Sequence, residues 1–591
     1  MTLSFADWII IIAYFVVSAG IGLYYTGRAS RSLSEYFLSG RSLPWWLAGT
    51  SMVATTFAAD TPLVVTGLVV RQGVAGNWLW WSLALSGILT VFFFARLWRR
   101  AGVLTDVEFV ELRYGGKPAA TLRGVRALYL ALPVNLIIMG WVTKAMADVL
   151  QITMGISGWR VAILLFLITA GYSILSGLWG VVVTDFFQFL VAMGGSVVLA
   201  VLAVQHIGGL DRLADAAATH FGSRETALGI VPLNSPIFPI QVFLTYIAVQ
   251  WWASWYPGAE PGGGGYVAQR IMSTRDERHG LLATLWFNIA HYALRPWPWI
   301  IVGLFAAVTY PDLSAPGADA GRGYARAMVD LLPSPMRGLL LAAFAAAYMS
   351  TIATHLNWGT SYFVNDFWLR FVRKGASDRE QVMVSRIATG VLMLLALVVM
   401  QFLSSVEQGW RLLLGMGAGT GLVLILRWYW WRINAWSELV AMAASLIVSL
   451  TLWEVFDMPA DHWVTLLITV GVTTAAWLVA TLLTRPESPE TLERFYRRAR
   501  PGGAGWRAVA ARLGFAGDTI PGGALSWVNW VAGWVAVYTS LFAIGQLLVG
   551  TIVLALVFGT MAAASFALIA RNLRRDATFR SAPVDSAAST A

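Results

Sequence analysis

Apolar stretches of membrane-crossing length follow one another along almost the whole chain. A helix needs about 20 apolar residues to cross a ~30 Å hydrocarbon layer, and about fifteen stretches of roughly 18 to 30 residues meet that requirement. The pattern predicts an all-α integral membrane protein with about 15 transmembrane helices. The expected spans are 6–25, 45–70, 78–98, 121–153, 159–177, 180–205, 237–256, 281–310, 335–371, 383–404, 409–430, 435–456, 462–484, 526–545 and 547–570.

Composition agrees with this pattern and excludes several classes of protein. Hydrophobic residues make up 58% and charged residues 12% of the 591 positions, which leaves too little polar surface for a water-soluble globule. Cysteine is absent and the six histidines lack the spacing of metal ligands, so metal–thiol enzymes are excluded. The net charge of +10 comes from short basic clusters at the ends of spans, where lipid headgroups account for them, and no nucleic-acid partner is expected.

Lysine and arginine concentrate in alternate loops, and this asymmetry predicts the topology. Loops rich in these residues stay on the cytoplasmic side, so the N-terminus is expected outside and the C-terminus in the cytoplasm. We therefore expect a multi-pass protein of the inner (plasma) membrane of a bacterium-like cell, embedded in the lipid bilayer. The basic loops lie around 28–41, 96–126, 270–278, 370–379, 485–512 and 571–580.

The second span, 45–70, carries polar residues that a lipid-facing helix would not tolerate, among them Asp60. Pro62 lacks a backbone donor and clashes with the preceding turn, so we expect a broken helix with free carbonyls around Ala54 to Ala58. Such carbonyls replace the hydration shell of a small cation in secondary transporters. A proline kink without a ligand is the alternative interpretation.

The ninth span supplies a complementary face. Ala347, Ser350, Thr351 and Thr354 recur at i, i+3, i+4 and i+7, which places three hydroxyls on one side of a helix. Hard cations such as sodium prefer oxygen ligands of this kind. Taken alone, a Ser/Thr stripe is more typical of helix packing, but its partner on the broken helix favours an ion site.

Four ionisable residues within spans are candidates for function. Asp185 is interpreted equally well as an ion ligand or as an interfacial acid. Arg295 lies deep in its span and needs an anionic partner or a water-filled cavity. Asp60 is the candidate partner, either in an ion pair or as the opposite pole of a solute pocket. His291 is expected to be a hydrogen-bonded structural residue.

Several ordered motifs over residues 1–430 resemble the sodium/solute symporter family, which includes sodium-coupled sugar, proline and sialic acid carriers. The resemblance implies a LeuT-like core of two inverted five-helix repeats, with one extra N-terminal helix and about four additional C-terminal helices. The motifs are SLSEYFLSGRSLPWW (32–46), VLTDVEFVELRYG (103–115), SGLWGVVVTDFFQ (176–188), YVAQR (266–270) and AAAYMSTIATHLNWGTSYFVNDFW (345–368).

This resemblance divides the chain into eight parts. They are the extra helix and its loop (1–44), the first repeat (45–205), an extracellular segment (206–236), the second repeat (237–433), two further helices (434–484), a cytoplasmic linker (485–525), two C-terminal helices (526–571) and a disordered tail (572–591).

The family's binding residues carry over position by position. Some members hold a second sodium, which would fall on Asp185 and Thr354, although Ala353 replaces a hydroxyl there. Trp80 replaces a carboxylate of a sugar carrier, which argues against a copied hexose site. The main sodium site falls on carbonyls or hydroxyls of Ala54, Phe57, Ala347, Ser350 and Thr351. The solute positions are Thr56, Asp60, Thr61, Trp80, Asn135, Tyr256 and Arg295.

We therefore expect a sodium-coupled secondary active symporter that imports a small polar organic solute, a sugar or a carboxylate-bearing molecule, by alternating access. No enzyme motif and no phosphate-binding loop for ATP is present, so catalysis is not expected. A proton-coupled carrier using Asp60, Asp185 or His291 is the alternative, and a transporter-like membrane sensor is a weaker one. The sequence leaves a homo-oligomer open.

Overall fold

The computed structural model describes residues 3–29, 38–256, 260–459 and 462–576. Within them, ten helices are long and apolar enough to cross a membrane, or eleven if one bent pair counts as a single span. The remaining predicted spans contain helical segments that are shorter, interrupted or part of a longer helix, and this accounts for the expected number of about 15. These spans are 159–177, 237–256, 281–310 and 409–430.

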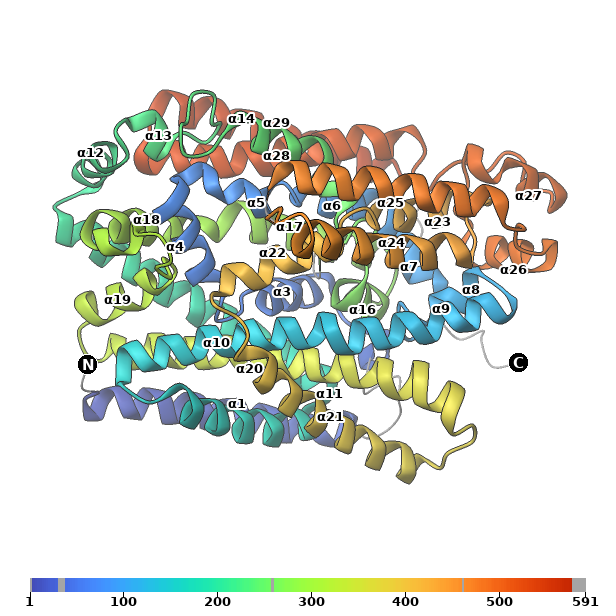
Figure 1. Ribbon diagram of the computed structural model, residues 1–591, viewed down its shortest axis with the longest axis horizontal. Coiled ribbons are helices and arrows are strands. Elements are labelled where there is room, and N and C mark those ends of the chain that lie inside the picture. The colour runs from blue at the N-terminus through green and yellow to red at the C-terminus, as the bar shows by residue number, and fades with distance from the viewer. Residues whose placement is uncertain (1–2, 30–37, 257–259, 460–461, 577–591) are drawn as a thin grey trace.

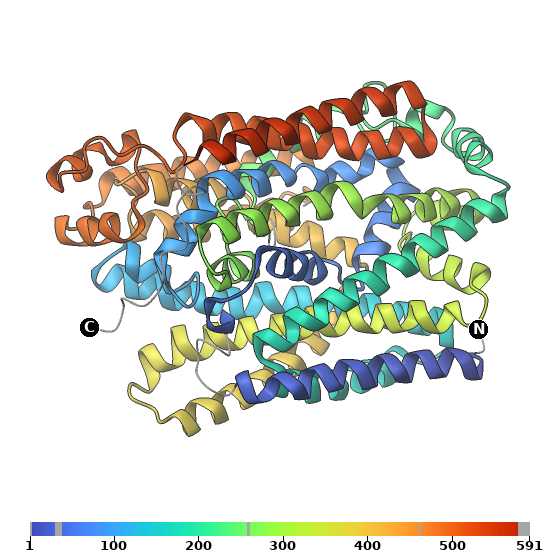
Figure 2. The same ribbon diagram turned by 180° about the vertical axis from the view of Figure 1, so that it is seen from behind.

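The helices run mainly along the longest axis of the molecule and enclose a central group (Figures 1 and 2). Helix α3 lies at the centre, α1 with α11 and α20 forms one edge, and the pair α28 and α29 forms the opposite edge. The bounds are α1 (Phe5–Ala29), α3 (Trp45–Thr56), α11 (Gly158–Ile207), α20 (Met336–Ser361), α28 (Ala524–Val549) and α29 (Ile552–Arg575).

The second predicted span is broken, as expected. Helix α3 ends at Thr56, α4 (Thr61–Gln72) begins after a short gap, and the two axes differ by 57°. The Thr61 hydroxyl donates to the Thr56 carbonyl at 3.1 Å, and the Thr61 amide donates to the Ala58 carbonyl at 3.3 Å. The amide of Thr61 thus bonds the Ala58 carbonyl, whose helical donor Pro62 lacks, and the Thr61 hydroxyl bonds the Thr56 carbonyl at the end of α3.

A second interruption follows the seventh predicted span. The chain forms α14 (Ile240–Thr245), the π-helical turn η5 (Tyr246–Gln250) and α15 (Trp251–Ala253), and the next helix is α16 (Gly265–Ser273). The glycine-rich approach includes Gly263, whose φ of +77° is a conformation that residues with a Cβ rarely adopt. The sequence predicted the seventh span but not α16, because an apolar count ignores a short polar helix inside the protein.

Loops predicted to share one side of the membrane contact one another at one end of the molecule. Arg96 pairs with Asp576 at 2.6 Å, and Arg370 pairs with Glu111 at 3.0 Å. Burial raises the pKa of Glu111, but hydrogen bonds from Arg370 and Arg123 outweigh burial and hold that pKa below its usual value. The first basic loop (30–37), Pro257 and most of the predicted tail (577–591) lie outside the described residues.

The remaining helices complete the cover of this core. In the C-terminal part of the chain, the boundaries of the predicted apolar spans agree with those of the observed helices to within a few residues. They are α9 (Gly116–Tyr129), α10 (Asn135–Met154), α17 (Glu277–Ile289), α18 (Pro296–Thr309), α19 (Arg322–Leu331), α21 (Asp378–Met400), α22 (Val406–Met416), α23 (Gly421–Tyr429), α24 (Ala435–Glu454), α25 (Trp463–Leu483), α26 (Pro489–Ala499) and α27 (Arg507–Arg512).

Helix α3 makes a close backbone contact with α17 at Gly49. A Cβ at this position would lie 2.5 Å from the Ala283 carbonyl oxygen and 2.9 Å from Cδ1 of Trp286, both on α17. Small residues permit such approaches between membrane helices, and the Trp286 indole also donates to Thr50 at 3.0 Å. Helix α3 is therefore seated tightly against α17.

We predict that Gly49→Ala destabilises the protein by about 1–3 kcal/mol, because the added methyl group overpacks this contact. Thermal unfolding of the purified protein measures the effect. Gly194→Ala on α11 is the matched control, because a Cβ there meets nothing within 4 Å. Equal melting temperatures for the two variants would contradict this account of the α3–α17 contact.

Candidate functional site

The broken helix and the hydroxyl face of α20 meet inside the protein. The Thr351 hydroxyl donates to the Thr55 carbonyl of α3 at 3.2 Å, and both side chains are buried. The Ala54 carbonyl accepts the Phe57 amide at 3.0 Å. The Phe57 carbonyl has no hydrogen-bond partner in the described part of the chain. The last turn of the broken helix is therefore in direct contact with the hydroxyl-bearing face of α20.

Asp185 lies fully buried between three helices. The Ser51 hydroxyl of α3 donates to Asp185 Oδ2 at 2.6 Å, and the Ser350 hydroxyl of α20 donates to Oδ1. Its position on α11 therefore links the broken helix to α20. Because both bonds come from hydroxyls on other helices, Asp185 is an interior carboxylate and not an acid at the membrane interface.

Arg270 is a buried cation beside this carboxylate that the sequence reasoning did not single out. Its guanidinium donates to Ser51 Oγ at 3.4 Å and to Thr354 Oγ1 at 3.4 Å, and it interacts electrostatically with Asp185. It enters from α16, the short helix after the second interruption. The available signal was the motif YVAQR (266–270), but its neighbours become visible only in the fold.

Arg295 contacts the last turn of α3 from another part of the chain. It follows the π-helical turn η6 (Ala290–Leu294) and directly precedes Pro296, the first residue of α18. Its amide donates to the Ala290 carbonyl at 3.3 Å, the wider spacing of a π turn, which alters the direction of the side chain. Nη1 donates to the Val53 carbonyl and to the Thr56 hydroxyl, each at 3.1 Å.

Asp60 and Arg295 do not form an ion pair among the described residues. Asp60 Oδ2 instead accepts the Trp410 indole N–H at 2.8 Å, and the Arg295 guanidinium lies over the Trp299 ring at 5.2 Å. His291 contacts the Thr56 hydroxyl at 3.0 Å, which agrees with the structural role expected for it. The direct ion pair is therefore not formed in this structure, and that Asp60 and Arg295 are opposite poles of a solute pocket stays a prediction.

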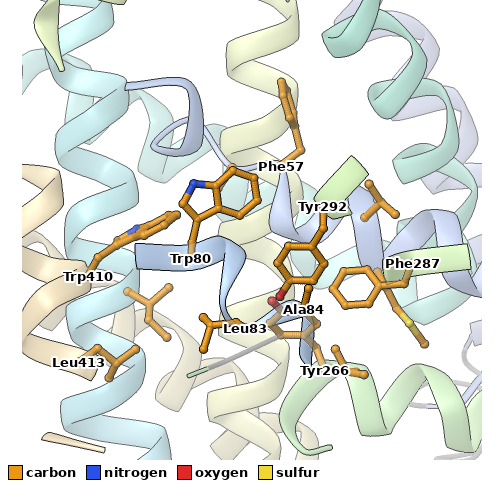
Figure 3. Close-up of a cluster of buried hydrophobic side chains, with 14 of the residues drawn as sticks. Phe57, Trp80, Leu83, Ala84, Tyr266, Phe287, Tyr292, Trp410 and Leu413 are labelled. Carbon is orange, nitrogen blue, oxygen red and sulfur yellow. The ribbon is translucent and has the colours of Figure 1, made fainter. Parts of the chain in front are cut away.

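These residues line a cavity of about 60 Å³, most of whose lining side chains are buried. Trp80, Tyr266, Tyr292 and Trp410 come from four different elements and project toward this region (Figure 3). Trp80 stacks on Tyr292 with ring centres 5.9 Å apart. The cavity is lined by Thr55, Thr56, Ala58, Asp60, Thr61, Trp80, Leu83, Ile138, Trp141, Val142, Tyr256, Tyr266, His291, Tyr292, Arg295, Thr351, His355 and Trp410.

Six of the seven solute positions expected from the sequence line this cavity. Five other aromatic and imidazole side chains that line the cavity were not predicted. The chain has 30 tryptophans and 18 tyrosines, and the sequence does not show which few of them face the cavity. The six residues are Thr56, Asp60, Thr61, Trp80, Tyr256 and Arg295. The missed residues are Trp141, Tyr266, Tyr292, His355 and Trp410.

Asn135 is the exception, because it does not line the cavity. Its side-chain amide donates to the His355 carbonyl at 2.9 Å, and its Oδ1 accepts the His355 ring N–H, whose Nδ1 is 2.8 Å away. His355 in turn lines the cavity. In this structure Asn135 therefore positions a lining residue from α10.

A double-mutant cycle tests this positioning role. We predict that Asn135→Ala and His355→Ala are each destabilising and that their effects are coupled by about 0.5–3 kcal/mol, since each removes the other's buried partner. Thermal unfolding of both single variants and of the double variant measures the coupling. Additive losses would show that the two side chains act independently.

Comparisons with known proteins identify the family of the chain. The family model "Sodium:solute symporter family" matches residues 36–446. The chain belongs to the sodium:solute symporter family. A sodium/mannose cotransporter of Bos taurus is 27% identical to this symporter over 483 residues, which cover 76% of the chain and 79% of the relative. A sodium/glucose cotransporter of Vibrio parahaemolyticus is 25% identical over 481 residues, which cover 76% and 85%.

A solved structure shares the fold of the symporter. A Na⁺-coupled sialic acid symporter in a substrate-bound, outward-open state matches 82% of this chain and 99% of its own, with a TM-score of 0.65 and 20% identity. The core is therefore LeuT-like, as the sequence motifs implied. Family membership makes the protein a sodium-coupled, multi-pass membrane symporter with Na⁺ as its coupling ion, and it does not favour proton coupling.

Proposed function

We propose that the symporter binds its main sodium ion where the broken helix faces α20. The expected ligands are the carbonyls of Ala54, Phe57 and Ala347 and the hydroxyls of Ser350 and Thr351. The single observation that carries this assignment is the bond from Thr351 to the Thr55 carbonyl, which joins the two elements. Neutral oxygens suit a monovalent ion, because they compensate its charge without the repulsion of several buried carboxylates.

The solute occupies the adjacent cavity, lined by Thr56, Asp60, Thr61, Trp80, Tyr256 and Arg295. It is a small polar organic molecule, a sugar or a carboxylate-bearing compound, and it is imported by alternating access. Sodium and solute favour the same conformations, and a coupling free energy of about 1–3 kcal/mol between the two sites suffices to link them. Asn135 contributes through His355, to which it is hydrogen-bonded.

A second sodium belongs to the same proposal, with Asp185 and Thr354 as ligands. Arg270 already donates to Thr354 and interacts with Asp185, so the arginine competes with this ion for the carboxylate. The second site is therefore the weaker of the two. Occupancy of the main site alone accounts for coupling.

The symporter operates in the inner membrane with its N-terminus outside and its C-terminus in the cytoplasm. Contacts among the basic loops support this topology, because ion pairs join one loop to another. The two inverted repeats comprise residues 45–205 and 237–433. Each contains an interruption, at the α3–α4 gap and between α15 and α16. The protein transports its solute without catalysing a reaction.

We predict that Ser350→Ala and Thr351→Ala each raise the sodium concentration for half-maximal uptake by about tenfold, because one ligand of the ion is lost. Uptake of the solute into proteoliposomes at varied sodium measures this. Thr360→Ala is the matched control: it lies on the same helix, it is buried, and its hydroxyl pairs with Thr389 away from the gap. An unchanged sodium dependence in both test variants would remove the assignment.

The choice of driving ion has its own test. We predict that an inward sodium gradient drives accumulation in proteoliposomes, and that an inward proton gradient without sodium does not. Asp185→Asn distinguishes the mechanisms further, because a carrier that needs this carboxylate as its proton carrier would lose all uphill transport. Accumulation driven equally well by a proton gradient alone would support the proton-coupled alternative.

A further inference from the structure

The central cavity contains one acidic and one basic side chain that do not satisfy each other. Asp60 and Arg295 are only 2% and 1% exposed, and both line the cavity. Oδ2 of Asp60 accepts a bond from Trp410, but Oδ1 has no hydrogen-bond partner among the described residues. Nη1 of Arg295 is bonded, but Nε likewise has no partner in the described part of the chain. Each of these two buried charges therefore lacks part of its hydrogen bonding.

Two polar neighbours in the cavity, Thr56 and Trp80, are committed to other bonds. The Thr56 hydroxyl already contacts both Arg295 and His291, and it donates to the Val53 carbonyl at 2.8 Å. The Trp80 indole donates to Asn77 at 3.0 Å. A buried charge that lacks a full set of partners is costly. A ligand that offers a cationic donor and an anionic acceptor would remove both deficits at once.

The size and walls of the cavity limit the ligand. Its volume of about 60 Å³ corresponds to roughly four to six water molecules, which is too small for a disaccharide. Trp80 and Tyr292 form a stacked aromatic wall (Figure 3). The Trp410 indole donates to Asp60. Aromatic faces attract cations and also pack against apolar groups. A compact molecule with an amino-acid-like size and charge distribution fits these limits.

We propose that the transported solute is a small zwitterion, with its carboxylate at Arg295 and its ammonium group at Asp60. The inference rests on the proposed location of the solute in the central cavity. A zwitterion leaves the net charge of the cavity unchanged and pairs both buried ions. A monocarboxylate would leave Asp60 without a cation, and a neutral sugar would offer only dipoles to two buried charges.

A thermal-shift panel on the purified full-length protein tests the class of solute. The probes are the twenty proteinogenic amino acids, β-alanine, glycine betaine, D-glucose and D-mannose. For each zwitterion that binds, its deaminated acid and its amide are measured as well. Each probe is measured in sodium and in choline. We expect at least one zwitterion to stabilise the protein in sodium, and both of its single-charge analogues to bind at least tenfold more weakly. A panel in which no zwitterion stabilises the protein overturns the proposal.

Variants assign the two charges of the ligand. In Asp60→Asn the affinity for the zwitterion should fall at least tenfold while that for its deaminated acid stays the same or rises, a pattern that general destabilisation does not produce. In Arg295→Gln the zwitterion and the deaminated acid should both weaken. Arg326→Gln is the control, because it removes an exposed arginine paired with Asp312. Equal losses for all ligands in Asp60→Asn would contradict the assignment.

The outcomes also separate this inference from the proposed function. Sodium-dependent stabilisation by D-glucose or a monocarboxylate, weakened in Arg295→Gln, would retain the cavity as the solute site and overturn the zwitterion. Sodium-dependent binding that is unchanged in both Asp60→Asn and Arg295→Gln would overturn the cavity as the solute site as well.

Discussion

The interruption between α3 and α4 is the constraint on which the rest of this structure depends. A helix break within a membrane exposes backbone groups that lipid cannot satisfy, so the surrounding protein has to bond them. The Thr56 carbonyl is bonded by Thr61 within the gap, the Thr55 carbonyl by Thr351 from α20, and the Val53 carbonyl by Arg295 from the start of α18. The break is thus held by contacts from three directions.

The last turn of α3 joins the proposed ion and solute sites. The Thr55 carbonyl faces α20, whereas the Thr56 hydroxyl contacts Arg295 and His291 at the cavity. Two adjacent residues therefore contact the two regions, so a movement of this turn would change contacts in both of them. Such a shared element supplies the differential contacts that coupling between two ligands requires.

Close helix packing and a π-helical turn both position the residues around the last turn of α3. Gly49 allows α3 to approach the backbone of α17, which fixes the helix before the break. Further along the same bundle, the π-helical turn η6 redirects Arg295 into the cavity, so a charged side chain reaches the interior without a loop. Asp185 on α11 accepts hydrogen bonds from Ser51 of α3 and from Ser350 of α20, and so connects these three helices.

The sequence by itself determined the membrane class, the broken second span and the hydroxyl face of the ninth, because hydrophobic length, Pro62 and helical spacing act locally. It could not determine how side chains from distant helices pair. Arg270 beside Asp185, Asn135 bonded to His355, and Asp60 bonded to Trp410 all join residues far apart in the chain. Only the tertiary structure decided these contacts, because a buried polar group bonds whichever partner the packing of helices brings within reach.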